Sequence, residues 1–278
     1  MHTPMQPLAP GEVFPGAFQE AWAASTAGGG TALTTTAAFA ILPDNVSSIE
    51  LIARNFAGGA LVAKFNLCPW LSVLKTTDSL ATATDYSDAA ASATTADVVL
   101  SSLGTAADGD YLFIGSHIPF RGVKVDMTAM NGTASVLTVK YWDGSAWTDI
   151  TATDGTIAGV ATFGQDGNVT WTVPTDWAKA ALSAGMTGTA MAIPYRDDAL
   201  YWTRWEVSVA LDATTTAATM IAMNRVTTYA EMIATFSREL RAHKGFGGIT
   251  AVEALTDGGT ANLIVNAFSR LGSAGLDL

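Results

Sequence analysis

The chain has 278 residues, of which 49% are hydrophobic and only 14% are charged, and its formal net charge is −11. This much apolar side chain can bury a sizeable core, which excludes a wholly disordered chain. The acidic balance argues against nucleic-acid binding, because affinity for a polyanion comes from lysine and arginine. So little charge predicts either a threonine-rich β-surface or a surface partly covered by neighbouring subunits.

Cys68 is the only cysteine, so the chain forms no internal disulfide and no cysteine-based metal cluster. It lies in the apolar run 65–70, which predicts a buried, inert thiol. The start of the chain has no secretory pattern, and no stretch of about 18 apolar residues occurs. We therefore expect a protein that is made in a cytoplasm and does not contact a membrane.

Residues 1–31 are predicted to form an N-terminal arm. Prolines keep its start extended, and Phe14, Phe18 and Trp22 then follow at a spacing of four. That spacing places three aromatic side chains on one side of a short helix, which the glycines at 28–30 end. The helix either packs back onto its own core or docks on a neighbouring subunit, so the three aromatics are candidate interface residues.

Residues 32–226 are predicted to form an antiparallel β-sandwich or jelly roll, in which 32–105 could be a separate subregion. The clearest signal is a hairpin: the apolar runs 136–142 and 146–150 flank Asp143-Gly144, a pair that suits a tight turn. Asp-Gly recurs at 154 and 166.

Two further patterns continue the predicted sandwich. Alternation along 169–173 and 201–209 predicts strands, with Trp205 on one face and Arg204 on the other face of the second. Between them, the segment 174–182 is predicted to be a short helix that begins after Pro174.

Residues 227–278 are predicted to form a C-terminal helix and a β-hairpin. Thr228 and Glu231 match a capping box, and apolar residues follow at helical spacing up to Leu240. The basic residues at 241–244 would favour the end of that helix. The runs on either side of 256–260 are predicted to pair as the hairpin.

The chain shows no pattern that predicts catalysis. Its three histidines are scattered, and His117 and the adjacent Ser116 would point to opposite faces of a strand. No sequence motif for a metal, a nucleotide or another cofactor is present. We therefore predict no catalytic residue, no cofactor and no metal ligand, and a protein that is not an enzyme.

Eight tryptophans are the remaining unusual feature. Trp142, Trp147 and Trp171 lie on predicted strands near turns. They either fill a thick sandwich core or form an exposed row on which sugars could stack.

The order of motifs in residues 110–226 resembles the β-modules of virion proteins from tailed bacteriophages. The matching pieces are the hairpin Val-Lys-Tyr-Trp-Asp-Gly-Ser-Ala-Trp at 139–147, the strand and turn Asn-Val-Thr-Trp-Thr-Val-Pro-Thr-Asp-Trp at 168–177, and the aromatic strand at 201–207. The segment 183–198 departs from that pattern, and no fibre-like repeat is present.

This resemblance implies a structural component of a phage particle, most simply a decoration or cement protein that binds the major capsid protein. A tail or baseplate protein is an alternative within the same class, and a carbohydrate-binding module is the alternative outside it. By analogy with decoration proteins we expect a homo-oligomer, with a trimer as the expected number. The chain would assemble in the host cytoplasm and reside in the virion.

Overall fold

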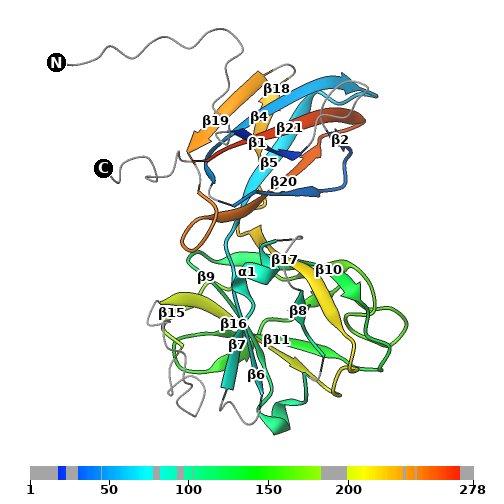
Figure 1. Ribbon diagram of the computed structural model, residues 1–278, viewed down its shortest axis with the longest axis vertical. Helices are drawn as coiled ribbons and strands as arrows, with labels where there is room; N and C mark the ends of the chain where they lie inside the picture. Colours follow the sequence, from blue (N-terminus) through cyan, green and yellow to red (C-terminus); the bar gives the residue numbers. More distant parts are fainter. Residues whose placement is uncertain are drawn as a thin grey trace, which may run out of the picture.

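The computed structural model describes residues 18–22, 31–44, 46–77, 82–92, 97–101, 103–182, 199–233, 236–241 and 243–269. Nearly all of its regular structure is antiparallel strand, arranged in four sheets. The sheets pack in pairs and form two sandwiches, one above the other in Figure 1. The antiparallel β-sandwich predicted from the sequence is therefore confirmed.

The first sandwich, drawn at the top of Figure 1, combines the two ends of the described chain. One sheet has the order β1 (Phe18–Trp22), β21 (Thr260–Ser269), β4 (Val46–Ala57), β19 (Phe236–Arg241), with β2 (Thr31–Leu33) also paired to β21. The other has the order β18 (Ala230–Ile233), β5 (Val62–Pro69), β20 (Ile249–Thr256), β3 (Ala38–Ile41). Apolar side chains from both sheets, such as Leu51, Val252 and Val265, are fully buried between them.

The second sandwich is built from the middle of the chain. One sheet has the order β12 (Trp147–Asp149), β11 (Leu137–Trp142), β16 (Leu200–Val207), β9 (Leu112–Ser116), β6 (Ser72–Thr77), β7 (Thr82–Asp85), with β15 (Lys179–Ala180) paired to β16. The other has the order β13 (Thr153–Asp154), β14 (Gly167–Thr170), β10 (Phe120–Ala129), β17 (Thr216–Asn224), β8 (Val98–Val99). The short helices α1 (Ser87–Ala90) and η1 (Ala106–Asp108) lie in its connections.

Alternating side chains explain why these residues form strands. Val123 and Val125 on β10 are fully buried, whereas Lys124 between them is only half-buried. On β16, Trp205 enters the core and Arg204 lies on the opposite face, as the period of two predicts. The predicted hairpin is also confirmed, because β11 pairs with β12 and Trp142 lies opposite Trp147.

The second sandwich is an insertion in the first. The chain leaves the first sandwich after β5, near residue 70, and returns before β18, near residue 229. The expected boundary at 226 thus falls at the return crossing. The expected domain 32–226 is nevertheless not one unit, because β3, β4 and β5 belong to the first sandwich, together with β18 to β21. Pairing partners about 200 residues apart leave no local trace in the sequence, which explains the difference.

The predicted C-terminal helix is wrong where the structure describes those residues. Residues 230–233 and 236–241 form β18 and β19, which pair with β5 and β4. Glu231 caps no helix and lies opposite Lys64 on β5. The helical spacing is overridden because the open edges of two sheets offer these residues a ladder of backbone hydrogen bonds.

Three smaller predictions are also corrected. The segment 174–182 forms a turn and the strand β15, which pairs with the first two residues of β16. β20 and β21 are strands as predicted, but they lie in opposite sheets and do not pair as a hairpin. Residues 18–22 of the arm form the strand β1 on β21, and not a helix, again because a sheet edge is available.

Candidate functional site: the joint between the two sandwiches

The two sandwiches meet where β10 and β17 of the second face β5 and β20 of the first. Cys68, Ile221 and Ala251 are buried there in one apolar cluster, with Phe39 packed against it. Because these side chains come from both sandwiches, the joint has a small core of its own, and burial of that core opposes separation.

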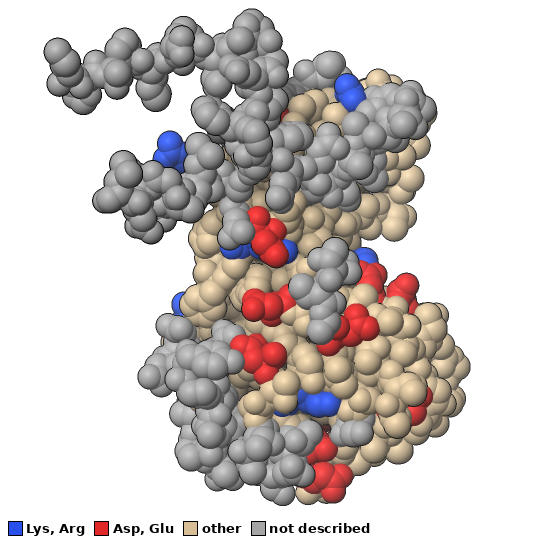
Figure 2. All heavy atoms as spheres, in the orientation of Figure 1, with Lys and Arg blue, Asp and Glu red and all other residues tan. Residues whose placement is uncertain are grey.

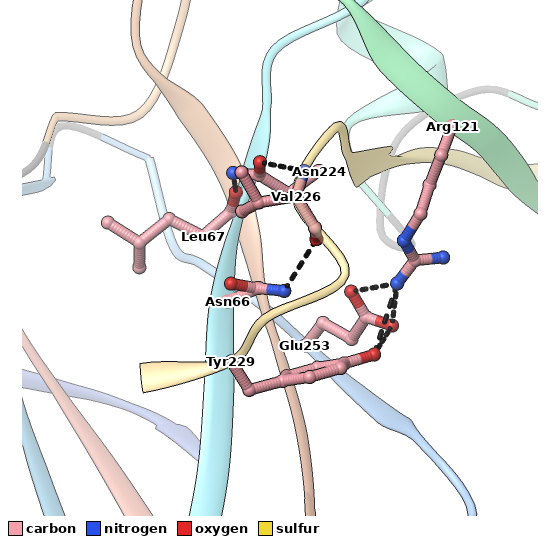
Figure 3. Close-up of polar contacts among 7 residues, drawn as sticks. All are labelled: Asn66, Leu67, Arg121, Asn224, Val226, Tyr229 and Glu253. Carbon is pink, nitrogen blue, oxygen red and sulfur yellow. Dashed lines mark hydrogen bonds and ion pairs between the residues drawn. The ribbon is translucent and has the colours of Figure 1, made fainter. Parts of the chain in front are cut away.

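A buried ion pair crosses the joint above this cluster. Nη2 of Arg121, on β10, lies 2.6 and 2.9 Å from the two carboxylate oxygens of Glu253, on β20. The hydroxyl of Tyr229, in the return crossing, donates to Oε1 of Glu253 at 2.7 Å. Figure 3 shows the side chains of Arg121 and Tyr229 converging on the carboxylate. Glu253 is 0% exposed, so these two donors take the place of water.

The local sequence places each member of this network. Val252 and Ala254 point into the first sandwich, so the alternation of a strand turns Glu253 outward to the joint. Arg121 is the second residue of β10, directly after the buried Phe120, and its carbonyl accepts from the backbone N–H of Trp171. The network therefore depends on two strands and the return crossing, which come from three separate parts of the chain.

Two asparagines fasten the return crossing. Nδ2 of Asn66 donates to the carbonyl of Val226 at 3.2 Å, and Nδ2 of Asn224 donates to the carbonyl of Leu67 at 2.8 Å. Oδ1 of Asn224 also accepts from the N–H of Val226 at 3.1 Å, as Figure 3 shows. Side chains from both sandwiches thus hold the same turn.

The raised pKa values of two groups at the joint favour a structural role for them over a role in proton transfer. Burial, together with the hydrogen bond to Glu253, raises the pKa of Tyr229 to about 12. Burial also raises the pKa of the Cys68 thiol well above its usual value. At neutral pH the phenol therefore keeps its proton as a donor to Glu253, and the thiol stays protonated, which confirms the buried thiol predicted from the sequence.

The candidate stacking residues do not form an open row. Trp171 is buried in the core of the second sandwich, where its Nε1 donates to the carbonyl of Phe120 at 2.8 Å. Trp142 is buried on the other face of β11, against Trp147 at a ring distance of 5.5 Å. Trp147 is half-buried and carries the guanidinium of Arg204 over its ring at 5.1 Å. Of the three, only Trp147 keeps appreciable exposure.

The candidate interface residues are only partly placed. Phe14 lies outside the described residues. The backbone of Phe18 and of Trp22 belongs to β1, opposite Phe268 and Val265 of β21. Docking of this segment on a neighbour therefore stays a prediction.

Sequence reasoning missed the network of Arg121, Tyr229 and Glu253. One signal was present: Glu253 is the only charged residue in the otherwise apolar strand 249–255. A lone carboxylate in such a strand requires a buried partner, but the partner is 132 residues away and nothing local identifies it.

In the part of the chain that the structure describes, no three metal-ligating side chains lie close enough to hold an ion. No helix among the described residues has both the length and the apolar character needed to span a bilayer. Comparison with protein-family models, with curated proteins and with solved structures gives no match for this chain.

Proposed function

We propose that this protein is a non-catalytic structural component of a tailed-bacteriophage particle, a decoration or cement protein that binds the major capsid protein. The observation that carries the proposal is the joint. Its apolar cluster and the buried contacts of Glu253 fix one sandwich on the other, so that surfaces at the two ends of the molecule keep a constant separation. A protein that bridges subunits of a shell needs such a constant spacing.

The surface of the second sandwich supports contacts with other proteins. At the end of β10 far from the joint, Val136 and Val160 are 62% and 72% exposed. The loops that carry them are tied together, because the N–H of Ser135 donates to the carbonyl of Val160 at 3.1 Å. Exposed apolar side chains on fixed loops are typical of contact surfaces.

Charge is sparse over much of the molecule, which also suits a face covered by neighbours. On the face drawn in Figure 2, acidic residues gather around the waist between the sandwiches, and uncharged described surface separates them from the few acidic and basic residues lower down. Interface cores are depleted in charged residues, because each one must lose its water on binding.

Mass spectrometry of purified particles tests the proposal directly. We expect this protein as a stoichiometric component, and we expect the purified protein to bind empty shells of the major capsid protein. Val136→Asp with Val160→Asp should weaken that binding, while Leu61→Asp, which places a charge on the other sandwich, serves as the matched control. Absence of the protein from particles would exclude the virion role. A position in the tail or baseplate would keep the role of a phage structural protein but exclude the role of a capsid decoration protein.

Carbohydrate binding is the second candidate, and the half-buried Trp147 carries it. Arg204 lies over the rings of both Trp147 and Tyr111, so a half-buried aromatic side chain and a charged group lie side by side. Such a pair can stack on a sugar ring and bond its hydroxyls. Glycan-array binding that Trp147→Ala abolishes, and Trp171→Phe does not, would favour this candidate.

We also propose that the protein is a homo-oligomer, with three copies as the expected number. Light scattering on the full chain and on a chain without residues 1–30 tests both the copy number and the docking of the arm. An unchanged mass after truncation would remove the arm from the interface.

A further inference from the structure

Three buried polar atoms without a hydrogen-bond partner lie beside the joint. They are Nε1 of Trp70, Oγ of Ser72 and Nδ1 of His117. The three residues line one recess. More than nine in ten buried polar groups in proteins are paired, and an unpaired one costs stability. Three of them around one recess indicate that the recess receives a polar ligand.

The strands fix these groups before any ligand arrives. Ser72 on β6 pairs with Gly115 on β9, and His117 follows the end of β9. Oγ of Ser116 donates to the carbonyl of Trp70 at 3.0 Å. This bond holds the segment near residue 70, where the chain leaves the first sandwich, against β9. Trp70 is 9% exposed and Ser72 is 1% exposed. Polar groups held this way need little reorganisation on binding.

The chemistry of the recess favours a negatively charged oxygen. The indole N–H of Trp70 can only donate a hydrogen bond, and the hydroxyl and the imidazole can both donate. Burial first, and then interactions with Lys179 and His243, lower the pKa of His117, and Lys179 places a cationic group near the recess.

Carboxylates lie on the other side of Trp70. Asp44 and Asp88 line a separate cleft of about 300 Å³, together with Lys244. Nζ of Lys244 lies 2.9 Å from Asp44, so this lysine partly offsets the acidic charge there. Among the described residues that line the recess itself, none is a carboxylate.

We propose that the recess beside Trp70 is a binding site for a small oxyanion, such as phosphate or the carboxylate of a small acid. The donors of Trp70 and Ser72 bond its oxygens, and His117 donates from the third side. This site is independent of the virion role proposed above.

The turn over the recess controls entry. About 140 Å³ of empty space lies in the recess and its opening to solvent, and none of it is wide enough for a water molecule, so an anion enters only if the turn moves. Phe246, at its mouth, is 46% exposed and stands between Gly245 and Gly247, which have φ angles of 124° and 75°. Backbone hydrogen bonds close the base of this turn, from the N–H of Gly248 to the carbonyl of Gly245 at 2.9 Å and from the N–H of Gly245 to the carbonyl of Ile249 at 3.2 Å. The carbonyl of Gly248 also accepts from the N–H of Trp70 at 3.0 Å, so only the tip at Phe246 and Gly247 is proposed to move. The glycines allow the turn to swing outward.

Calorimetric titration of the full chain with inorganic phosphate and with acetate, at constant ionic strength, tests the site. We expect saturable binding of one anion per chain, weakened about tenfold in Trp70→Phe and in His117→Gln, the effect of one lost bond to a charged group. Trp171→Phe is the matched control, because that indole N–H already has a partner in Phe120 and the variant should bind like the wild type. Absence of saturable binding by both anions, or equal affinity in Trp70→Phe and the wild type, would overturn the proposal.

Thermal melting in anion-free buffer gives a second readout. Trp70→Phe removes an unpaired donor, so its melting temperature should equal or exceed that of the wild type. Trp171→Phe leaves the carbonyl of Phe120 unpaired and should melt lower. If Trp70→Phe does not fold, Ser72→Ala takes its place in the titration, with the same expected loss of affinity. A melting temperature of Trp70→Phe below that of Trp171→Phe would contradict the unpaired state of Trp70.

Discussion

Single side chains at the joint illustrate how a buried charge can hold a fold together. The carboxylate of Glu253 is fully buried, Arg121 supplies the opposite charge, and the neutral hydroxyl of Tyr229 donates a hydrogen bond to it. Removing one member of such a pair leaves the other buried and uncompensated, which costs more than the pair contributes.

We therefore expect Arg121→Met to lower the free energy of unfolding by about 3–5 kcal/mol, and Tyr229→Phe to lower it by about 1.5–3 kcal/mol. The double variant Arg121→Met with Glu253→Met should lose much less than the sum of its two single variants. Urea denaturation of the wild type, Arg121→Met, Glu253→Met and the double variant measures this double-mutant cycle. The matched control is Glu231→Gln, since the exposed pair of Glu231 with Lys64 at 3.9 Å should contribute under about 1 kcal/mol. An additive cycle at the joint would contradict the coupling.

The thiol of Cys68 gives a simple probe of the same region. The side chain is 0% exposed, and burial raises its pKa, so the reactive thiolate is scarce. We expect no reaction with Ellman's reagent at pH 8 in the native protein and one thiol per chain in a denaturing concentration of guanidinium. Reaction in Arg121→Met at a rate above that of the wild type would show that the joint opens when the ion pair is removed. A fast native reaction would mean that the apolar cluster is accessible.

Loops have no ladder of backbone hydrogen bonds between strands, and in this protein the carboxylate of an aspartate connects two of them. Asp212 accepts from the N–H of Gly132 at 2.7 Å and from the hydroxyl of Thr215 at 2.7 Å, which ties together two loops at the far end of the second sandwich. These bonds, with that of Gly132 first, lower the pKa of Asp212 from 3.8 to about 2.

The lowered pKa of Asp212 predicts a pH-dependent contribution to stability. A carboxyl whose pKa is lower in the folded state contributes fully above its unfolded pKa and loses that contribution as the pH falls through the folded value. We expect Asp212→Asn to melt below the wild type at pH 7, and the difference to shrink between about pH 4 and pH 2. Thermal melts across this range measure it, with the exposed Glu231→Gln as a control for one lost charge. A difference independent of pH would contradict the role of the ionised carboxylate.

The path of the chain predicts which fragment folds alone. Every residue of the larger core of the second sandwich comes from 71–222, and the crossings on either side lie together, since Asn224 bonds to Leu67. We therefore expect residues 70–226 to fold as a monomer with the near-ultraviolet dichroism of packed tryptophans.

The segment 1–226, which follows the boundary predicted from the sequence, is the informative comparison. It keeps β4 and β5 but lacks β20 and β21, the strands that each of them pairs with along most of its length. We expect this fragment to aggregate through its unpaired edges. Dichroism and size-exclusion chromatography of both fragments decide the matter, and a soluble, folded 1–226 fragment would contradict the division into these two sandwiches.

The sequence by itself determined the features that depend on neighbouring residues. The alternation of Trp205 with Arg204, the turn at Asp143-Gly144 and the apolar surroundings of Cys68 predicted a strand, a hairpin and a buried thiol, and all are present. Each is local: a strand shows its period of two over a few residues, and a turn depends on the conformations open to glycine.

Only the tertiary structure decided which strands pair, and with that the fold of residues 230–241 and the joint itself. That segment has apolar residues at helical spacing but forms β18 and β19, because two sheet edges were open to it. Glu253 contacts Arg121 because one sandwich is an insertion in the other. Long-range pairing is selected by the total surface that the whole chain can bury. A short stretch of sequence does not contain that information, because the buried surface depends on all the strands together.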